Sequence, residues 1–382
     1  MKRKIVVTTG TRAEYGILRP ILKLIQKSKK LELYLIVTGT HLSKTRGFTI
    51  NEIKKDGFKI FKTIPMMPEK DTGYFMSLAL GKAIVNFSDV FYKVKPHLNL
   101  ILGDRDEMLA SSIAAYHMNI PNAHIHGGDK SGGIDEYTRH AITKMSNIHF
   151  AASKESKKRI IKLGENPKYV FLTGSPSIDE ISSNKITSKE ELEKKYHLKL
   201  NGDEILLLYH SITTEPELSG KHVKIILDAI VHLRKSTIAI LPNNDAGSKK
   251  IYNYLRLFSR KYDFIKLYAS LPRSDFLGML KNCGVLVGNS SSGIIEASYF
   301  KTPVVNIGKR QEGREKGAHV FDVKEISNSS VSTTISSALR NKKSHNKFNK
   351  NVYGSGNASK KIVEYLEKIN LTKDLFQKQI TY

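Results

Sequence analysis

The amino-acid sequence predicts an α/β protein made of two doubly wound domains in tandem. The chain has 382 residues, and at roughly 100–200 residues per domain this length favours two domains, each able to bury its own core. Short apolar runs alternate with amphipathic stretches, which is typical of βαβ units and of parallel sheets covered by helices on both faces. The alternation stops once, in a polar stretch at 183–203, and then starts again.

The first domain is predicted over residues 1–182. Its strands are expected at short runs of Val, Ile, Leu, Tyr and Phe, and its helices where apolar residues recur every three or four positions. Gly164 is placed to end one of these helices. The expected order is strand Lys4–Thr9, helix Glu14–Ser28, strand Leu31–Thr38, a helix-like stretch at 43–56, strand 58–63, helix 74–94, strand Leu98–Gly103, helix Asp106–Met118, strand Asn122–Ile125, helix Glu136–Ser146, strand 148–152, helix 153–163 and strand 169–173.

The second domain is predicted over residues 204–355, after a connector at 183–203 that is rich in Ser, Lys, Glu and Asn and carries a short helix. Residues 356–382 carry the last helix, Ala358–Ile369, which is expected to pack back on the first domain. Two doubly wound domains in tandem place a cleft between the carboxyl ends of their sheets. The strands of the second domain are expected, with helices between them, at 204–210, 236–241, 263–268, 284–288 and 303–307.

The composition limits the class of protein and its compartment. The single cysteine, Cys283, excludes an intramolecular disulfide framework and fits a reducing compartment. No apolar run approaches the roughly 20 residues that a membrane helix needs. The apolar stretch after the basic start, Ile5–Val7, is too short for the core of a signal peptide. We therefore expect a cytoplasmic protein with no membrane partner.

The net charge is strongly positive, because 62 Lys and Arg oppose 36 Asp and Glu to give +26. Residues 1–182 carry 29 basic and 17 acidic side chains and residues 183–382 carry 33 and 19, so the charge is spread evenly. A basic nucleic-acid-binding protein is the alternative that this charge suggests, but no recognition helix, zinc finger or RNP-type pattern accompanies it. We expect no nucleic-acid partner. One segment differs from the basic remainder of the chain, because residues 101–136 hold six acidic and two basic side chains.

Arg12 lies in the loop between the first expected strand and its helix. In a βαβ unit this loop is where backbone N–H groups and a helix dipole meet a phosphate. Arg12 could neutralise an anion there, or it could be a solvated loop residue. The loop contains no G-x-G-x-x-G and no Walker sequence, so a dinucleotide or ATP is not favoured and no cofactor is expected.

Asp104 lies in the acidic segment, where the strand Leu98–Gly103 ends and a helix begins. Arg105 follows it, and the next two acids, Asp106 and Glu107, fall in the first helical turn, where the helix dipole alone accounts for them. The D-x-D spelling is shared with the metal-binding motif of some sugar-nucleotide transferases. A helix cap explains it more simply.

His124 and His126 would share one face of the strand Asn122–Ile125 and its extension, as in a metal site. No neighbouring Cys or further His completes a cluster. A strand histidine whose hydrogen bonds are satisfied and a site-lining His126 are therefore favoured over a ligand pair, and no metal is expected.

Two further acids follow these histidines. Gly127-Gly128 lets the backbone approach a ligand closely, and Asp129 comes directly after it. Asp135 lies six residues beyond Asp129. Together with Asp104, these side chains could converge as acids and bases in one cleft.

Three serines, Ser290 to Ser292, follow the expected strand 284–288, and Gly293 leads into a helix that continues through Glu296. A strand, a Ser/Gly loop and a helix together form an anion cradle, because free N–H groups, hydroxyls and the positive helix end all point at the ligand. A plain serine N-cap is the alternative.

Arg310 and Arg314 follow the next expected strand and could reach the same anion. An arginine fits a phosphate bidentately. The second domain is therefore predicted to bind the phosphates of a nucleotide.

Six segments carry a family resemblance, and they run in order from about residue 5 to about 368. They are T-R-A-E-Y-G, L-G-D-R, H-I-H-G-G-D-K-S-G-G-I-D-E-Y-T-R-H-A-I-T-K, G-N-S-S-S-G-I-I-E, N-I-G-K-R-Q-E-G-R and Y-G-S-G-N-A. Together they resemble the hydrolysing UDP-N-acetylglucosamine 2-epimerases. The resemblance implies the GT-B fold, with two Rossmann-like doubly wound domains whose parallel sheets face a central cleft, and it implies a homodimer.

The resemblance also implies an activity. Such enzymes convert UDP-N-acetylglucosamine, or a related nucleotide-linked 2-acetamido sugar, and water to UDP and N-acetylmannosamine or the corresponding 2-epimer, for sialic acid synthesis. UDP leaves to give a glycal, which is then hydrated. The departing diphosphate creates oxocarbenium-like charge that carboxylates stabilise, and several acids around one ring suit the proton transfers at C2.

The resemblance assigns the catalytic carboxylates to Asp104, Asp129 and Asp135. The family usually has Glu where Asp129 stands, and it usually has Pro after His210, where this chain has Ser211. With the candidates above, the predicted nucleotide- and substrate-binding residues are Arg12, Arg105, His126, His210, Asn243, Ser290, Ser291, Gly293, Glu296, Arg310 and Arg314.

Three related activities remain as alternatives. Close relatives act on UDP- or GDP-linked diacetamido sugars on the way to legionaminic acid, so a UDP-diacetylbacillosamine-type 2-epimerase is one of them. A non-hydrolysing epimerase would return UDP-N-acetylmannosamine instead of a free sugar. A GT-B glycosyltransferase would share the nucleotide site but would not need the acidic segment at 101–136.

Overall fold

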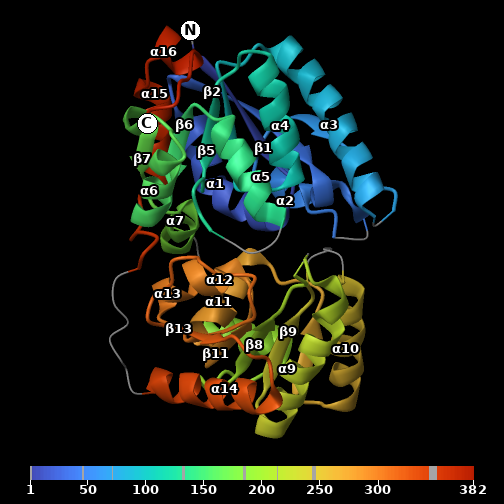
Figure 1. Ribbon diagram of the computed structural model, residues 1–382. Helices are drawn as coiled ribbons and strands as arrows, with labels where there is room; N and C mark the ends of the chain where they lie inside the picture. Colours follow the sequence, from blue (N-terminus) through green and yellow to red (C-terminus); the bar gives the residue numbers. More distant parts are fainter. Residues whose placement is uncertain are drawn as a thin grey trace. The chain divides into compact units, whose positions relative to one another are not determined.

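The computed structural model describes residues 2–44, 47–70, 72–130, 134–183, 186–212, 214–242, 247–343 and 351–382. The chain divides into two compact units, which we call the N-unit and the C-unit (Figure 1). The N-unit consists of Met1–Asp129, Asp135–Glu180 and Tyr353–Tyr382, and the C-unit consists of Lys130–Ile134 and Ile181–Val352. The chain therefore returns to the N-unit for its last thirty residues or so.

A seven-stranded parallel sheet lies at the centre of the N-unit. Its strands are β1 (Arg3–Thr9), β2 (Leu31–Thr38), β3 (Ile60–Ile64), β4 (Leu98–Leu102), β5 (Asn122–Ile125), β6 (Ile148–Ala151) and β7 (Val170–Leu172). The spatial order is β3-β2-β1-β4-β5-β6-β7. The order reverses between the neighbours β1 and β4, and ligands of doubly wound sheets bind outside the carboxyl ends of strands at such a switch point.

Helices cover both faces of this sheet (Figure 1). Ile5 and Val7 of β1 pack in one core and Val6 packs in the other. Burial on both faces explains why Ile5, Val6 and Val7 form a continuous apolar run and do not alternate with polar residues. The helices are α1 (Arg12–Lys27), α2 (Ile50–Lys55), α3 (Gly73–Val94), α4 (Asp106–His117), α5 (Ile134–Lys144), α6 (Lys154–Lys162), α7 (Pro176–Ser183), α15 (Ala358–Lys368) and α16 (Lys373–Phe376), with the 3-10 turns η1 (Gly39–Leu42) and η3 (Pro167–Tyr169).

The C-unit is built around a second parallel sheet, of six strands. The strands are β8 (Ile205–Leu208), β9 (Thr237–Ile240), β10 (Ile265–Tyr268), β11 (Val285–Gly288), β12 (Val304–Ile307) and β13 (Val320–Val323). Their order is β10-β9-β8-β11-β12-β13, so the switch point lies between β8 and β11. The helices are α8 (Lys189–Tyr196), α9 (Ser219–Leu233), α10 (Ser248–Lys261), α11 (Arg273–Asn282), α12 (Ser291–Ile295), α13 (Ala297–Phe300) and α14 (Asn328–Lys343), with the 3-10 turn η4 (Pro216–Leu218).

Helix α15 is held in the N-unit by packing and by a cap from a distant part of the sequence. The ring of Tyr365 stacks on Phe171 with a centroid separation of 3.9 Å. The carboxylate of Asp179, in α7, accepts hydrogen bonds from the backbone N–H of Ala358, at 3.0 Å, and of Ser359. A side-chain cap of this kind stabilises a helix end by about 0.5–2 kcal/mol.

The predicted fold class and the parallel alternation are confirmed, but four elements were not predicted, namely strand β13 and helices α7, α14 and α16. Strand β13 is at the edge of its sheet and half-exposed, so it lacks the continuous apolar run of a central strand. Helix α7 begins with Pro176, in a G-S-P-S sequence that suggests a turn, yet proline is well suited to the first position of a helix. Within the helix-like stretch at 43–56, the described α-helix spans only Ile50–Lys55.

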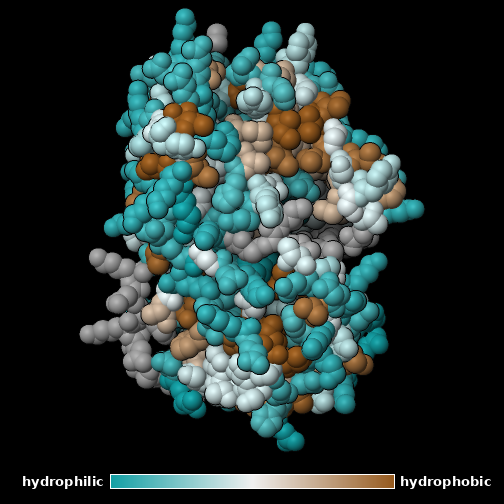
Figure 2. Space-filling view, viewed as in Figure 1, coloured by the Kyte–Doolittle hydropathy of each residue, from teal (hydrophilic) through white to brown (hydrophobic). Residues whose placement is uncertain are grey.

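The described helices include none with the combination of length and apolar character that crossing a membrane requires. Figure 2 shows a mainly hydrophilic surface with a hydrophobic area near α3 and α4. The exposed apolar side chains of α3 include Met76, Leu78 and Val85.

Candidate active site

The loop after β1 uses its own backbone amides to start α1. Thr11 is the N-cap, and its hydroxyl accepts a hydrogen bond from the Glu14 N–H at 3.3 Å. In return, Glu14 Oε2 accepts from the N–H groups of Gly10, at 2.9 Å, and Thr11, at 3.1 Å, which completes a capping box. The amides that the loop position offered to a phosphate are therefore bound by a carboxylate of the protein itself.

Arg12 is held by a carboxylate of α2. Its Nη2 lies 2.8 Å from Glu52 Oε1, and its Nε donates to Glu52 Oε2 at 3.2 Å. An anion at this loop would have to share Arg12 with Glu52 or displace it.

Two buried glutamates face one arginine at the β1–β4 switch point. Arg105 Nε lies 3.8 Å from Glu14 Oε1 and 3.4 Å from Glu107 Oε2. Burial, followed by the charge of Glu107, raises the pKa of Glu14 to about 8. A Cβ atom at Gly10 would lie 2.8 Å from the Glu107 carboxylate, so the glycine makes room for this pair. Glu14 was not among the predicted site residues; its only signal in the sequence is the Thr-x-x-Glu spacing of a capping box.

A buried arginine links two of the predicted carboxylates. Arg139, in α5, is ion-paired with Asp104, which follows β4, and its Nη1 donates to the backbone carbonyl of Asp129, at 2.9 Å, and to Glu136 Oε2, at 2.7 Å. Its side chain is 2% exposed. Burial alone would lower the pKa of Arg139, but the charges of Asp104 and Asp129 outweigh it and hold the pKa above its ordinary value. Arg139 was not among the predicted site residues.

The two other predicted carboxylates of the N-unit differ in their surroundings. Asp129 is buried, and its side chain bonds to His126 Nδ1 at 3.1 Å and accepts from the Ser156 hydroxyl at 2.6 Å. Asp135 is half-buried in the first turn of α5, one helical turn from Arg139. The N-unit thus brings Asp104 and Asp129 together through Arg139 and places Asp135 on the same helix as that arginine.

The two histidines of H-I-H do not form a pair. Strand β5 ends at Ile125, and His126 has a φ of +66°, so the alternation that would align the two side chains stops before it. His124 is buried with its Nε2 2.7 Å from the Gly103 carbonyl, and burial lowers its pKa to about 3. Among the residues that the structure describes, no group of three or more His, Cys, Asp or Glu side chains is arranged to hold a metal ion.

In the C-unit, Asn289 connects the two strands of the switch point. Its side-chain Oδ1 accepts from the His210 N–H at 2.7 Å and its Nδ2 donates to the His210 carbonyl at 2.8 Å. Its own carbonyl accepts from Arg310 Nη1 and from Gln311 Nε2, both at 3.0 Å. Burial, followed by the charge of Arg310, lowers the pKa of His210 well below its ordinary value and so favours the neutral imidazole.

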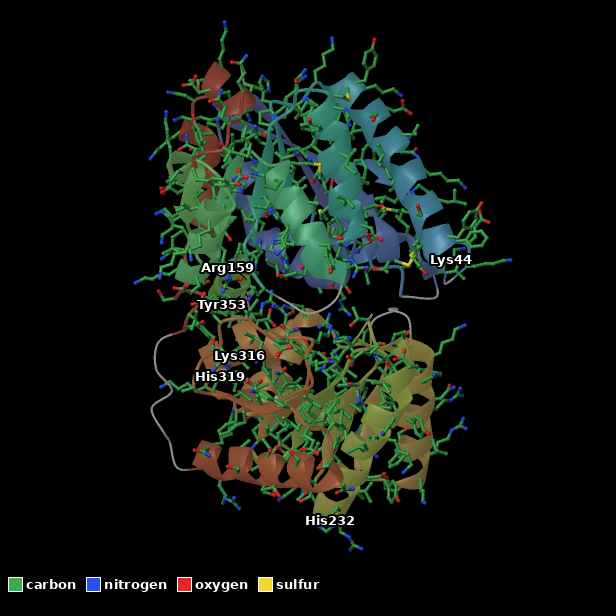
Figure 3. All side chains as sticks on the ribbon, in the orientation of Figure 1. Lys44, Arg159, His232, Lys316, His319 and Tyr353 are labelled. Carbon is green, nitrogen blue, oxygen red and sulfur yellow. The ribbon has the colours of Figure 1, made fainter. Side chains whose placement is uncertain are left out.

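The serine loop after β11 leads into helix α12, which ends at Ile295, one residue before the predicted helix end at Glu296. Ser290 caps α12, with its hydroxyl accepting from the Ser292 N–H at 3.3 Å, and Ser291 is the first residue of this five-residue helix. Gly293 faces the sheet, since a Cβ there would lie 2.8 Å from a methyl of Val304. Its carbonyl accepts from His319 Nε2 at 3.1 Å (Figure 3). Gly293 is thus used for close helix–sheet packing.

Two of the remaining predicted binding residues of the C-unit have partners within the protein. Glu296 is buried and makes a bidentate ion pair with Arg273 of α11, which sequence analysis did not single out. Arg314 Nη1 donates to Gln311 Oε1 at 2.9 Å. Asn243 lies outside the described residues.

Comparison with known proteins identifies relatives over the whole chain. A family model described as UDP-N-acetylglucosamine 2-epimerase matches residues 23–367. The chain is 37% identical over 382 residues, covering 100% of both proteins, to the UDP-N,N'-diacetylbacillosamine 2-epimerase (hydrolyzing) of Legionella pneumophila. It is 37% identical over 324 residues, 84% of each protein, to the GDP/UDP-N,N'-diacetylbacillosamine 2-epimerase (hydrolyzing) of Campylobacter jejuni.

Solved structures share the fold. The UDP-GlcNAc 2-epimerase from Neisseria meningitidis, bound to UDP-GlcNAc, superposes with a TM-score of 0.82 at 21% identity, over 96% of this chain and 100% of that one. The Methanocaldococcus jannaschii UDP-GlcNAc 2-epimerase, in complex with UDP-GlcNAc and UDP, gives 0.78 at 20% identity over 96% and 99%. These similarities, with the two parallel sheets, show a GT-B fold of two Rossmann-like domains.

The raised pKa of Glu14 generates a prediction for stability. Between the ordinary Glu pKa of about 4.3 and the folded value of about 8, the folded chain binds one proton more than the unfolded chain. The free energy of unfolding should therefore fall as the pH rises through this range. Glu14→Gln keeps an acceptor for the two loop amides and cannot ionise, so its stability should lose this slope.

Urea unfolding of wild type and Glu14→Gln at pH 5, 6, 7 and 8 measures the effect, with exposed Glu32→Gln as the control. The difference in unfolding free energy should move in favour of Glu14→Gln as the pH rises. Parallel pH dependences for all three proteins would show that the extra proton is not on Glu14.

Proposed function

Because the chain belongs to the UDP-N-acetylglucosamine 2-epimerase family, we propose that it is a hydrolysing 2-epimerase of UDP-linked 2-acetamido sugars. It converts the nucleotide sugar and water to UDP and the free 2-epimer, and it works in the cytoplasm. The observation that carries this proposal is the acidic network at the strand ends of the N-unit, in which buried Arg139 holds Asp104 beside the Asp129 loop. A glycosyltransferase would not need a cluster of acids there.

Two substrates are proposed for direct comparison. UDP-N-acetylglucosamine would give N-acetylmannosamine, as sialic acid synthesis requires. UDP-N,N'-diacetylbacillosamine would give the 2-epimer used for legionaminic acid, and the 37% identity to a full-length epimerase named for that sugar supports it. Their relative kcat/KM values decide between them.

The chemistry requires two proton transfers at one carbon. UDP leaves C1 with the electron pair of the C1–O bond, and the positive charge that develops on the ring acidifies the C2 hydrogen. A carboxylate removes that proton to give the C1=C2 double bond of a glycal. Water then adds its oxygen to C1 while an acid delivers a proton to the opposite face of C2. Asp104, Asp129 and Asp135 are proposed to supply this acid–base system.

The C-unit is proposed to bind the UDP part of the substrate. His210, Ser290, Ser291 and Arg310 lie at or next to the β8–β11 switch point, where doubly wound sheets bind ligands. Arg310 can offer its guanidinium to a diphosphate, which develops negative charge as it leaves. Arg12, Arg105, His126, Asn243, Gly293, Glu296 and Arg314 stay predictions as substrate-binding residues.

A homodimer is proposed as well. The family resemblance implies it, and the exposed apolar side chains of α3 offer surface for a second copy. Light scattering that gives the mass of one chain would refute it.

The UDP site predicts a ligand-induced stabilisation that depends on Arg310. UDP at 100 times its dissociation constant should stabilise the fold by about 2.7 kcal/mol, seen as a rise in melting temperature. Arg310→Ala should abolish most of this rise, whereas Lys309→Ala, which removes an exposed neighbouring cation, should not. An equal rise in all three proteins would place UDP elsewhere.

The acid–base proposal predicts a loss of turnover with nucleotide binding retained. Asp104→Asn and Asp135→Asn should each lower kcat by about 10²–10⁴, because a proton-transferring carboxyl is removed, and should leave UDP affinity unchanged. Asp106→Asn, in the same acidic segment, is the matched control. In D₂O the product should carry deuterium at C2. A 2-epimer with only protium at C2 would contradict an exchanging acid–base group.

A further inference from the structure

A chain of buried hydrogen bonds runs through the turn that follows β5. The Ser156 hydroxyl bonds to Asp129 Oδ1 at 2.6 Å, and Asp129 Oδ2 lies 3.1 Å from His126 Nδ1. On the other side of the imidazole, His126 Nε2 lies 3.0 Å from the Ser175 hydroxyl, which lies 2.7 Å from the Ser177 hydroxyl. The turn after β5, helix α6, the residue before α7 and the first turn of α7 each contribute to this series of hydrogen bonds.

The chemistry of the groups fixes the direction of these bonds. An ionised carboxylate only accepts hydrogen bonds, so His126 Nδ1 carries the hydrogen that points at Asp129. In the neutral imidazole Nε2 is then an acceptor, and the Ser175 hydroxyl donates to it. This is the Nδ1–H tautomer, which leaves Nε2 as the atom that can take up a proton.

This series of hydrogen bonds can accommodate both the neutral and the protonated imidazole of His126. If Nε2 gains a proton, the Ser175 hydroxyl can rotate to accept from it and to donate to Ser177, because a hydroxyl is both donor and acceptor. The Asp129 carboxylate still accepts from Nδ1–H and now opposes the positive charge. His124 differs in this respect, because its Nε2 faces a carbonyl, which can only accept.

Burial separates the roles of Asp129 and His126. The carboxylate of Asp129 is 1% exposed and the imidazole of His126 is 8% exposed, whereas the side chain of Asp104 is 24% exposed. Asp129 therefore offers almost no surface to a sugar, and the imidazole is the more accessible of the two groups.

The turn is also built to hold this arrangement. His126 adopts a φ of +66°, which is unfavourable for a residue with a side chain and is found mainly where the surrounding structure enforces it, often at functional sites. Gly128, two residues after His126, has a φ of +72°. A Cβ atom at this position would collide with the Ser156 carbonyl of α6. Arg159 of α6 donates to the Gly128 carbonyl at 2.7 Å (Figure 3).

We propose that His126 is a proton-carrying catalytic residue and that Asp129 is its positioning residue. This inference rests on the proposed epimerase function and refines it: one of the two proton transfers at C2 passes through His126 Nε2, and Asp129 acts by holding the Nδ1–H tautomer. When His126 acts as the base, the C2–H bond breaks, its electron pair forms the C1=C2 bond of the glycal and its proton goes to Nε2. The Ser175 donation to Nε2 then ends, and the Asp129 carboxylate stabilises the imidazolium. When His126 acts as the acid, the proton moves from Nε2 to C2, where the C1=C2 electron pair forms the new C2–H bond as water adds to C1. The Ser175 hydroxyl then donates to Nε2 again.

The order Ser175–His126–Asp129 is also that of a hydrolase triad. Ser175 is 1% exposed, however, and its hydroxyl contacts Ser177 as well. It is therefore placed as a reversible hydrogen-bond partner of the imidazole and not as a nucleophile.

The tautomer of His126 is determined by ¹⁵N NMR of the full-length protein with ¹⁵N-labelled histidines. The His126 signals are assigned as those missing from the spectrum of His126→Gln. Wild type should show His126 with hydrogen on Nδ1. The variants Asp129→Asn, Asp129→Ala and Ser175→Ala are then measured for the tautomer, for kcat and for KM. The matched control is Ser112→Ala, which removes another buried hydroxyl whose hydrogen bond goes to a backbone carbonyl.

We expect kcat to depend on which nitrogen of His126 carries the hydrogen. Every variant that loses Nδ1–H should lose on the order of 10²-fold or more in kcat with little change in KM, and every variant that keeps it should stay within about tenfold of wild type. A wild-type imidazole with hydrogen on Nε2 would overturn the proposal, and so would a variant that keeps Nδ1–H but loses turnover. Wild-type kcat in Asp129→Ala would overturn it too.

The tautomer of wild-type His126 is measured without relying on any variant of Asp129. The proposal can therefore be tested even if Asp129→Ala does not fold. If wild type shows the Nδ1–H tautomer but does not epimerise a nucleotide sugar at C2, the proposed function fails and the placement of the imidazole stands. If it epimerises with the other tautomer, the proposed roles of His126 and Asp129 fail and the proposed function stands.

Discussion

Arg139 carries its charge almost completely out of water, and a charge in that position is strongly unfavourable unless anions and carbonyls surround it. Its partners come from Asp104 after β4, from the backbone of Asp129 after β5 and from Glu136 one turn away in α5. All three must be in place together, so the guanidinium fixes two strand ends and a helix relative to one another. Removing one carboxylate partner would leave a buried charge and cost about 3–5 kcal/mol.

The fold was predictable because its strands are buried on both faces. Continuous apolar runs such as Ile205–Leu208 are characteristic of parallel sheets. The family resemblance, which the comparisons confirm, implied the GT-B arrangement. Strand β13 and helix α7 were missed for local reasons. The first is half-exposed at a sheet edge, and the second starts in a sequence that equally suits a turn.

The site was less predictable, because a side chain's partners come from distant elements. Asp104 and Asp129 could be named from their positions at strand ends, but nothing near them in the sequence points to Ser156 or Ser175 as neighbours. The same holds for Glu296, whose bidentate partner Arg273 is 23 residues away. Sequence patterns locate the edge of a sheet where chemistry occurs, whereas hydrogen-bond networks depend on tertiary packing that a local pattern does not encode.

The central claim is that this chain releases a free 2-epimer by breaking the C1–O bond of a nucleotide sugar. The most direct measurement is mass spectrometry of both products after reaction of UDP-N,N'-diacetylbacillosamine or UDP-N-acetylglucosamine in H₂¹⁸O. The account predicts equal amounts of UDP and free 2-epimer, with no ¹⁸O in the UDP, because its β-phosphate keeps the bridging oxygen. Incorporation of ¹⁸O into UDP, or a final product that is still nucleotide-linked, would contradict it.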